Sequence, residues 1–549
     1  SAADGSVFKI GGIGPTTGDA AIYGTAVKNG IQLAVDEINA AGGINGKQIE
    51  YKFEDDQADS EKSVNAYNTL KDWGMQALIG TTTSTPCTAV VEETHSDNMF
   101  QLTPSATAVD SIQYDNAFRM CFSDPNQGSA SADYIADNKL ATKVAIIYNS
   151  SDTYSSGIYQ TFATEAKAKG LYEIIGAAID DKYIAQVKAQ VVNQGAIDRM
   201  QDQITIVYTP LHGTGNIPAR RVMKELGFTH VYVVPQQELP DGDFPTVSYP
   251  NPEAKEAFEL GLALAKEKNA DLVLATDPDA DRLGVYAKDT KTGEYVSFTG
   301  NMSGMLIAEY ILREKKANGT LPANGALVET IVTTDMAKAI AKAYGVKLIE
   351  VLTGFKYIGE QIKFFEQQNS YEYVFGLEES YGCLAGTYAR DKDACVAVMM
   401  LCEVAAWCKS NGITLWDAMV SLYETYGYYK EGLETMTLKG MDGAEKIQSM
   451  MNEMRNNPPK KIGVWDVLAL RDYKKDTRTD MTSGEVTPTG LPESNVLYYE
   501  LSNNAWCCVR PSGTEPKIKF YFGVVGTDIK DSEKKLDELR TAMLTYAGE

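Results

Sequence analysis

The length and charge of the chain exclude several classes of protein. With 549 residues it is too long for one hydrophobic core, so several domains of roughly 100 to 200 residues are expected. Its 74 acidic and 51 basic residues leave a net charge of -23, which argues against nucleic acid as a partner, because that binding requires basic patches. No apolar run reaches the roughly 18 residues that a membrane-spanning helix needs. The eight cysteines form no CxxC pair, which predicts free core thiols rather than a zinc or iron-sulfur site.

The first third of the sequence alternates strand and helix patterns. The expected elements are strands at 7–13, 49–53 and 77–79, with helices at about 27–38 and 60–71 between them. This alternation is typical of a parallel sheet and predicts an α/β architecture. The segment Gly11–Pro15 fits a dinucleotide fingerprint poorly, because Thr17 stands at the third glycine position and Pro15 has no amide hydrogen.

Three carboxylates at alternate positions follow a short apolar run near the middle of the chain. Asp277, Asp279 and Asp281 offer the oxygen ligands that hard divalent cations prefer. Arg282 cannot be a ligand, because its guanidinium only donates, and it would hold a carboxylate or phosphate beside the metal. An EF-hand is excluded by spacing, since its glycine and glutamate positions hold Arg282 and Lys288. A solvated acidic turn is the remaining alternative for Thr276–Arg282, called the metal loop below.

Two later loops carry residues typical of ligand binding. In Gly376–Gly382, called the sugar loop below, Glu378 and Ser380 alternate, so their side chains should point the same way and suit vicinal sugar hydroxyls. The alternative for that loop is a solvated run. The segment Arg510–Lys517 combines a guanidinium, two hydroxyls and free amides, which form a cradle for a phosphate, or else a plain turn. It is not a Walker loop, which would need Gly-Lys-Ser or Gly-Lys-Thr.

The remaining elements continue the α/β pattern and end in a mixed domain. Strands are expected at 144–148, 204–208, 231–234 and 373–375, helices at about 156–169 and 253–268 and around Arg220, and a loop at 474–495. The predicted fold class is several doubly wound α/β domains followed by a C-terminal α+β domain. The predicted domains are a truncated α/β lobe at 1–174, an α/β domain with the metal loop at 175–299, an α/β domain with the sugar loop at 300–425, and an α+β phosphate-binding domain at 426–549.

The first of these segments resembles a known family of binding proteins. Its matching motifs are Gly14–Gly18, Asp36–Gly46, Ile79-Gly80 with Ser84, and Thr103–Thr107. From about 6 to 170 the chain is similar to the N-terminal part of periplasmic solute-binding proteins of the branched-chain amino-acid type. The resemblance implies an extracellular or periplasmic setting and a branched-chain amino acid as ligand, bound by Tyr23, Ser84, Ser105, Thr107 and Tyr154. Without it, these serines and threonines would be ordinary turn residues. Only the first strand and helix of the family's second lobe are present, so weak binding at best is expected.

The rest of the chain, about 175–549, resembles a second family. The segments Thr209–Gly215, Asp277–Arg282, Glu378–Ser380 and Arg510–Thr514 occur in the order found in the α-D-phosphohexomutase superfamily, most closely bacterial phosphoglucomutases. The resemblance implies a cytoplasmic enzyme that interconverts glucose 1-phosphate and glucose 6-phosphate, with Mg2+ as cofactor and glucose 1,6-bisphosphate as activator.

The same resemblance implies a role for each matching residue. Asp277, Asp279 and Asp281 bind Mg2+, and Glu378 with Ser380 reads sugar hydroxyls. His212, Lys356 and Arg282 take part in catalysis, His212 as a general acid or base. The residues that hold the hexose phosphate are Lys356, Arg390 and Lys392, with Arg510, Ser512, Gly513 and Thr514 around the phosphate that is not transferred. His95 and His230 are expected to be structural.

Each part of the chain is interrupted where its site would be completed. The family's phosphoserine lies in a Thr-Ala-Ser-His-Asn-Pro loop, and the nearest string here is Thr103-Pro104-Ser105-Ala106. The predicted activity is therefore impaired, and a non-catalytic sugar-phosphate binder is an alternative. One family is exported and the other cytosolic, so a join of two sources near 170–180, such as an engineered chimera or a misassembled sequence, is a more economical interpretation than a natural fusion.

Overall fold

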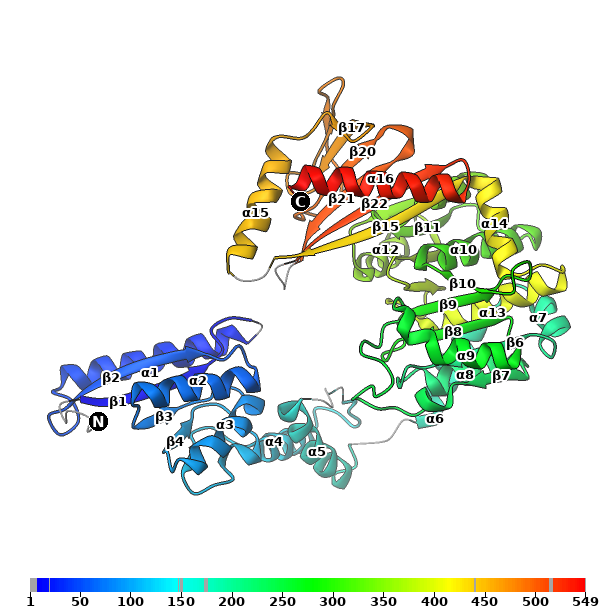
Figure 1. Ribbon diagram of the computed structural model, residues 1–549. Coiled ribbons are helices and arrows are strands. Elements are labelled where there is room, and N and C mark those ends of the chain that lie inside the picture. Colours follow the sequence, from blue (N-terminus) through cyan, green and yellow to red (C-terminus); the bar gives the residue numbers. More distant parts are fainter. Residues whose placement is uncertain are drawn as a thin grey trace. The chain divides into compact units, whose positions relative to one another are not determined.

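The computed structural model describes residues 7–18, 20–146, 148, 152–171, 176–438, 441–512 and 517–548 (Figure 1). The chain divides into two compact units, Ser1–Gly176 and Ala177–Glu549. Both are built from helices and sheets, and the predicted fold class is confirmed. All eight cysteines are free, and seven of them are buried, as predicted.

The first unit contains a five-stranded parallel sheet in the order β2-β1-β3-β4-β5. Its elements are β1 (Val7–Gly14), α1 (Ala21–Ala40), β2 (Gln48–Asp55), α2 (Ser60–Trp73), β3 (Ala77–Ile79), α3 (Ser84–Ser96), β4 (Gln101–Thr103), η1 (Val109–Ile112), β5 (Ala117–Arg119), α4 (Asp124–Asp137) and α5 (Thr153–Ala168). Tyr67 and Leu70 of α2 pack with Ile13, whereas Ile31 and Val35 of α1 pack with Ile49 in a separate cluster. The alternating pattern of the sequence thus produces two apolar layers around one sheet.

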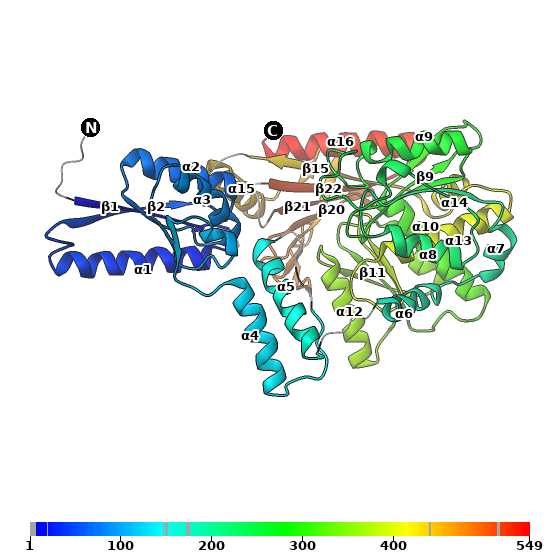
Figure 2. The same ribbon diagram turned by 90° about the horizontal axis from the view of Figure 1, so that it is seen from below.

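The strand expected at 144–148 is not formed in the part of this segment that the structure describes. Strands are stabilised by hydrogen bonds to a neighbour, and the sheet of the first unit ends at β5. Val144 instead donates its backbone N–H to the carbonyl of Leu171 (2.9 Å). The helices α4 and α5 pack against each other, with buried Ala132 and Ala166 between them (Figure 2).

The second unit begins with a mixed sheet in the order β10-β9-β8-β6-β7. Its elements are α6 (Gly176–Lys188), α7 (Gln194–Met200), β6 (Thr205–Thr209), α8 (Asn216–Glu225), β7 (His230–Val233), η2 (Pro235–Gln237), η3 (Lys255–Phe258), α9 (Glu259–Lys268), β8 (Leu272–Thr276), β9 (Leu283–Lys288) and β10 (Tyr295–Phe298). The α-helix expected from 253 begins only at Glu259. Asn251 forms a turn there, accepting from the backbone N–H groups of Glu253 (2.8 Å) and Ala254 (2.9 Å).

A four-stranded sheet in the order β12-β11-β13-β14 follows. Its elements are α10 (Gly300–Ala317), β11 (Gly325–Thr330), α11 (Met336–Tyr344), β12 (Lys347–Val351), α12 (Phe355–Gln368), β13 (Glu372–Leu377), β14 (Cys383–Ala385), α13 (Ala394–Ser410) and α14 (Leu415–Tyr426). The apolar helix α13 is almost entirely buried, and it shares one core with residues of both sheets. In the described parts of the chain no single helix is long and apolar enough to cross a membrane, and only the pair α13 and α14, bent by 88°, passes by length and composition.

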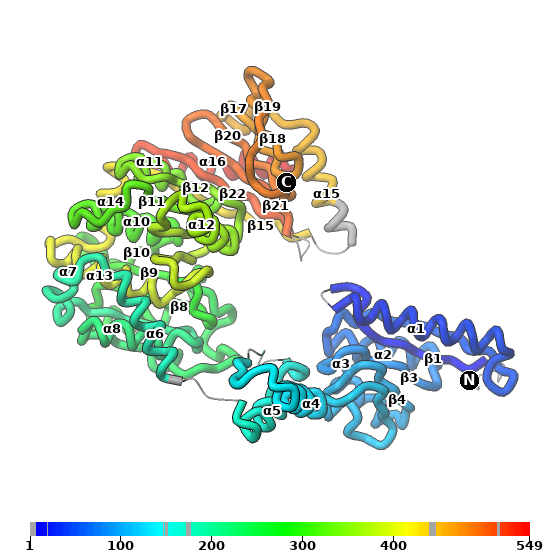
Figure 3. The backbone as a smooth tube through the Cα atoms, turned by 180° about the vertical axis from the view of Figure 1, so that it is seen from behind, coloured from blue at the N-terminus to red at the C-terminus, as the bar shows by residue number. Residues whose placement is uncertain are grey.

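The chain ends in an eight-stranded antiparallel sheet that carries two helices (Figure 3). Its elements are β15 (Tyr428–Thr437), α15 (Met441–Asn456), β16 (Lys461–Ile462), β17 (Trp465–Asp472), β18 (Thr477–Asp480), β19 (Val486–Thr487), β20 (Leu497–Leu501), η4 (Ser502–Asn504), β21 (Trp506–Pro511), β22 (Lys517–Gly526) and α16 (Ile529–Ala547). The loop expected at 474–495 was wrong in part, because β18 and β19 form a hairpin there. Arg478 anchors the hairpin by donating to Glu500 (2.6 Å), and Asp480 accepts the backbone N–H groups of its turn.

A fully buried carboxyl group, Glu403 of α13, fixes the start of the second unit. It accepts hydrogen bonds from the backbone N–H of Asn193 (2.6 Å), the backbone N–H of Val192 (3.2 Å) and the hydroxyl of Tyr310 (3.0 Å). Burial raises the pKa of Glu403 to about 7, although these donors lower it. The carboxyl group is therefore more easily protonated in the folded than in the unfolded chain.

We expect this group to make the second unit less stable at high pH. The stabilising contribution of Glu403 to the free energy of unfolding is fully present below its unfolded pKa near 4.5. It amounts to about 3 kcal/mol and is lost as pH rises through the folded pKa of about 7. Glu403→Gln should reduce the loss of unfolding free energy between pH 5 and pH 8, measured by urea titration. Glu267→Gln, at an exposed position, serves as the control. The same pH slope in Glu403→Gln and the parent protein would contradict the assignment.

Candidate functional site

The metal loop is shaped by one of its own aspartates. The buried strand β8 ends at Thr276, and Asp277 Oδ1 then accepts the backbone N–H groups of Asp281 (3.0 Å) and Arg282 (2.9 Å). Ala280 takes the left-handed conformation (φ 58°) that this turn requires. The loop curls back, so that one carboxylate oxygen each from Asp277, Asp279 and Asp281 lies within 4.8 Å of the others.

The electrostatics of this cluster fit a divalent cation. Burial raises the pKa of Asp277 to about 7, and the neighbouring charges of Asp281 and Asp279 raise it further, against the effect of the backbone hydrogen bond from Arg282. Asp281 Oδ1 is buried without a hydrogen-bond partner, and Arg282 Nε lies 3.6 Å from it, too far for a hydrogen bond. Three crowded carboxylates with a free oxygen form an oxygen-rich donor set of the type that binds Mg2+. The residues present therefore fit this ion.

The loop after β6 packs against the metal loop. The backbone N–H of Thr214 donates to the carbonyl of Pro278 (2.8 Å), and a Cβ at Gly213 would lie 2.3 Å from Pro278 Cα. His212 in this loop is buried, and both ring nitrogens are engaged, Nδ1 with the carbonyl of Leu239 (3.2 Å) and Nε2 with Thr246 Oγ1 (2.9 Å). These contacts position the loop, and a general acid or base role for His212 stays a prediction.

The sugar loop lies beside the metal loop. Ser380 donates to Glu378 Oε1 (2.8 Å), so these two side chains lie together, while Glu379 accepts from Thr330 (3.1 Å). The backbone N–H of Leu283, at the end of the metal loop, donates to the carbonyl of Tyr381 (3.0 Å).

Lys392 links the two loops through its ammonium group. Its Nζ lies 3.0 Å from Asp281 Oδ2 and 3.9 Å from Glu378 Oε1. Burial raises the pKa of Glu378, although Ser380 and Lys392 lower it. The residues predicted to bind metal and sugar are thus neighbours in space.

Arg510 of β21 lies beside Thr353. Its Nη1 donates to Thr353 Oγ1 (2.6 Å), and its Nε is buried without a hydrogen-bond partner. The backbone N–H of Ser512 donates to the carbonyl of Lys517 (2.7 Å). The predicted residues Gly513 and Thr514 lie outside the described residues. A half-buried guanidinium whose Nε has no hydrogen-bond partner is suited to an anionic ligand.

Two predicted substrate residues point elsewhere. Arg390 Nη2 pairs with Glu366 (2.7 Å), and its Nη1 donates to the carbonyl groups of Thr387 and Ala389. Lys356 is exposed, with its Nζ 4.9 Å from the ring centre of Tyr357. Their roles in substrate binding stay predictions.

A cleft of about 610 Å³ brings the loops of the second unit together. Its lining includes Arg282, Glu378, Ser380, Thr353 and Arg510. Several further lining residues were not predicted from the sequence, and these are Glu253, Asn301, Glu431, Lys519 and Tyr521.

These residues differ in whether a sequence pattern could have predicted them. Lys519 pairs directly with Arg510 across β21 and β22, and a lysine at a fixed strand position after the phosphate motif is a signal that could have found it. Glu431 had no such signal. It accepts from Thr334 Oγ1 (2.5 Å) and Asn301 Nδ2 (3.1 Å), which are about a hundred residues away or more.

The predicted amino-acid ligands of the first unit are only partly brought together. Ser84 Oγ accepts the backbone N–H of Thr107 (3.2 Å), and Ser105 Oγ donates to the carbonyl of Thr82 (2.6 Å) at the carboxyl ends of β3 and β4. Tyr23 is 66% exposed, and Tyr154 contacts Gln127 (3.4 Å). The three hydroxyl residues thus form one polar corner, and the two tyrosines lie on the surface of the unit.

Two family models match the chain. The periplasmic binding protein model matches residues 7–237, and the model of the α/β/α domain III of phosphoglucomutase/phosphomannomutase matches residues 299–426. The first match passes the boundary between the units, since residues 177–237 include β6 and β7 of the sheet that carries the metal loop.

Comparison with individual proteins gives one curated relative and two solved structures. The phosphoglucomutase of Staphylococcus epidermidis (strain ATCC 12228) is 36% identical over 339 residues, which are 60% of this chain and 61% of that protein. A structure of parafusin, a phosphoglucomutase from Paramecium, has a TM-score of 0.47 at 16% identity and covers 67% of this chain and 62% of its own. The branched-chain amino acid binding protein LivJ from Streptococcus pneumoniae has a TM-score of 0.29 at 26% identity, covering 41% of this chain and 64% of its own.

The curated relatives are therefore matched over less than two thirds of their length. The two similarities agree with the motifs of the sequence. The chain joins a segment similar to periplasmic binding proteins to a segment similar to phosphoglucomutases.

Proposed function

We propose that the second unit is a Mg2+-dependent phosphoryl-transfer site that binds glucose 1-phosphate and glucose 6-phosphate. The observation that carries this proposal is the lining of one cleft by Arg282 of the metal loop, Glu378 and Ser380 of the sugar loop, and Arg510. Phosphoryl transfer to a hexose phosphate needs these three kinds of group, because the site must hold the phosphoryl group in transfer, the vicinal hydroxyls and the phosphate already on the sugar.

Each group has a defined task in this proposal. When bound by Asp277, Asp279 and Asp281, Mg2+ offsets the charge on the transferring phosphoryl group. Arg282 lies within 3.7 Å of Asp277 and Asp281, where its guanidinium holds the metal ligands and faces the same phosphoryl group. Glu378 accepts hydrogen bonds from the sugar hydroxyls, and Ser380 donates to them or accepts from them. Arg510 and Lys519 hold the phosphate that is not transferred.

The phosphoryl donor limits this activity in our proposal. The 549 residues contain no Thr-Ala-Ser-His-Asn-Pro loop, and Ser105 of the nearest string donates to the carbonyl of Thr82 in the other unit. The chain should therefore bind hexose phosphate and exchange phosphoryl groups slowly, even with glucose 1,6-bisphosphate present.

The first unit supports a second, separate proposal, weak binding of a branched-chain amino acid. Ser84 and Thr107 follow the ends of parallel strands, and both side chains are buried. Such hydroxyls suit the carboxylate of a free amino acid. The family model that matches residues 7–237 supports the same class of ligand-binding fold.

We expect Asp281→Asn to weaken Mg2+ binding by at least 10-fold, because it removes one of three anionic ligands. Calorimetric titration of the whole chain with Mg2+ measures the affinity. Asp243→Asn changes an exposed aspartate outside the cluster and should leave the affinity unchanged. Equal affinities of Asp281→Asn and the parent protein would remove the metal site from the account.

Glucose 6-phosphate should bind in the presence of Mg2+ with little conversion to glucose 1-phosphate. Arg510→Ala should weaken this binding at least 10-fold, because the half-buried cation proposed to bind the phosphate is lost. Tyr23→Ala, in the other unit, is the matched control. Calorimetry and a coupled assay for the product measure the two quantities. Turnover at an ordinary enzyme rate of about 10 s⁻¹ would refute the proposed impairment.

Leucine, isoleucine and valine should bind the first unit no more tightly than about 1 mM, because most of the second lobe is lacking. Calorimetry with each amino acid tests this expectation, and Thr107→Val should abolish any heat that is observed. Micromolar affinity would show instead that the first unit is sufficient for tight binding.

A further inference from the structure

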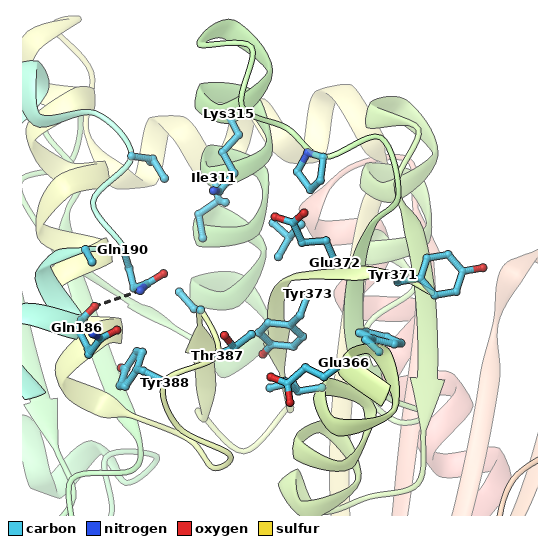
Figure 4. Close-up of a pocket in the computed structure, with 18 of the residues that line it drawn as sticks. Gln186, Gln190, Ile311, Lys315, Glu366, Tyr371, Glu372, Tyr373, Thr387 and Tyr388 are labelled. Carbon is cyan, nitrogen blue, oxygen red and sulfur yellow. Dashed lines mark hydrogen bonds between the residues drawn. The ribbon is translucent and has the colours of Figure 1, made fainter. Parts of the chain in front are cut away.

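A second pocket of about 550 Å³ lies on the second unit (Figure 4). It is formed by α6 and the residues that follow it, by α10 and α12, and by β13 and β14 with the turn after β14. None of its lining residues lines the cleft described above. The pocket is therefore separate from the cleft, and none of its residues takes part in the proposed phosphoryl transfer.

The pocket has an apolar floor and a polar rim. Ile311, Phe365 and Tyr373 of the floor are buried, and the hydroxyl of Tyr373 is engaged by the carbonyl of Leu384 (2.9 Å). Figure 4 shows Gln186, Gln190 and Tyr388 on one side, and Glu366, Tyr373 and Glu372 on the opposite side. Amides and carboxylates thus lie on opposite sides of the pocket, with an aromatic ring on each side.

The charges around the pocket balance. Glu366 pairs with Arg390 (2.7 Å), and Lys315 and Glu372 on the rim carry opposite charges. This balance disfavours a phosphorylated ligand and favours a neutral one. Neutral sugars match the rest of the lining, because amide and carboxylate groups bind vicinal hydroxyls while aromatic rings pack on the C–H faces. We propose that this pocket binds a neutral, unphosphorylated carbohydrate.

A chain of hydrogen bonds connects the pocket to the metal loop. The hydroxyl of Tyr388, a lining residue, donates to Asp393, which also accepts from the hydroxyl of Tyr183 (2.9 Å). Asp393 caps α13 by accepting the backbone N–H of Cys395 (2.7 Å). The next residue, Ala394, donates its backbone N–H to the carbonyl of Ala280 in the metal loop (3.0 Å).

The residue before Asp393 completes the connection. Lys392 places its ammonium 3.0 Å from Asp281. A sugar seated against Tyr388 therefore acts, through the hydrogen bond of Tyr388 to Asp393, on the segment that contacts both the backbone and one carboxylate of the metal loop. Sugar binding and Mg2+ binding are coupled through this segment, a coupling that rests on the proposed metal site, whereas the sugar site itself does not.

Binding is tested by calorimetry of the whole chain with maltotriose, a neutral sugar that has no phosphate for Arg510. We expect saturable binding of maltotriose. Gln186→Ala and Glu372→Ala should each weaken it about 10-fold, because each removes one or two hydrogen bonds to the sugar. Glu493→Ala, an exposed glutamate outside the pocket, and Arg510→Ala should leave it unchanged. Absence of binding, or equal affinities in both pocket variants and the parent protein, would overturn the proposal.

Coupling is tested by titrating Mg2+ with and without saturating maltotriose. We expect the Mg2+ affinity to change at least threefold, and the sugar affinity to change by the same factor when Mg2+ is present. Tyr388→Phe and Tyr183→Phe keep the rings and remove one hydroxyl each, so both should reduce this factor while sugar still binds. An unchanged Mg2+ affinity in the parent protein would overturn the coupling. Loss of Mg2+ binding altogether would refute the metal site and leave the maltotriose measurement intact.

Discussion

The site of the second unit depends on one side chain that holds its own loop. Asp277 accepts the backbone N–H groups of Asp281 and Arg282, and this pair of hydrogen bonds turns the chain back just after the buried strand β8. The turn gathers three carboxylates and aims Arg282 at them. It also sets the start of β9, where Leu283 meets the sugar loop. The metal cluster, the sugar loop and the cleft therefore share a single local constraint.

Burial makes this arrangement costly without a cation. The same surroundings that raise the pKa of Asp277 leave Asp281 Oδ1 without a hydrogen-bond partner, and Lys392 supplies the nearest ammonium group. Proteins commonly store such unfavourable electrostatics at functional sites rather than in structural cores. Glu403 shows the structural counterpart, because its buried carboxyl group is fully occupied by three donors. Glu403, whose carboxyl group has three donors, is thus typical of a structural residue, whereas Asp281, with one unpartnered carboxylate oxygen, is typical of a ligand-binding residue.

The sequence was informative wherever the chemistry was local. The metal loop, the pairing of Glu378 with Ser380 and most strand positions follow from short patterns, because each depends on residues within a few positions. The strand expected at 144–148 and the loop expected at 474–495 depended on distant partners. The described residues of the first add no strand to the sheet that ends at β5, and Glu500 anchors a hairpin in the second.

Side-chain direction was the least predictable property of the site. Arg390 and Lys392 are two residues apart, yet one pairs with Glu366 and the other with Asp281. Asp393 accepts from Tyr183, which lies 210 residues away in the sequence, and no local pattern reveals this contact. The most direct measurement is a crystal structure of the chain with Mn2+ and glucose 6-phosphate, because Mn2+ is visible by anomalous scattering. The account predicts the ion among Asp277, Asp279 and Asp281 and a phosphate at Arg510, and a bound ion or sugar phosphate at any other place would contradict it.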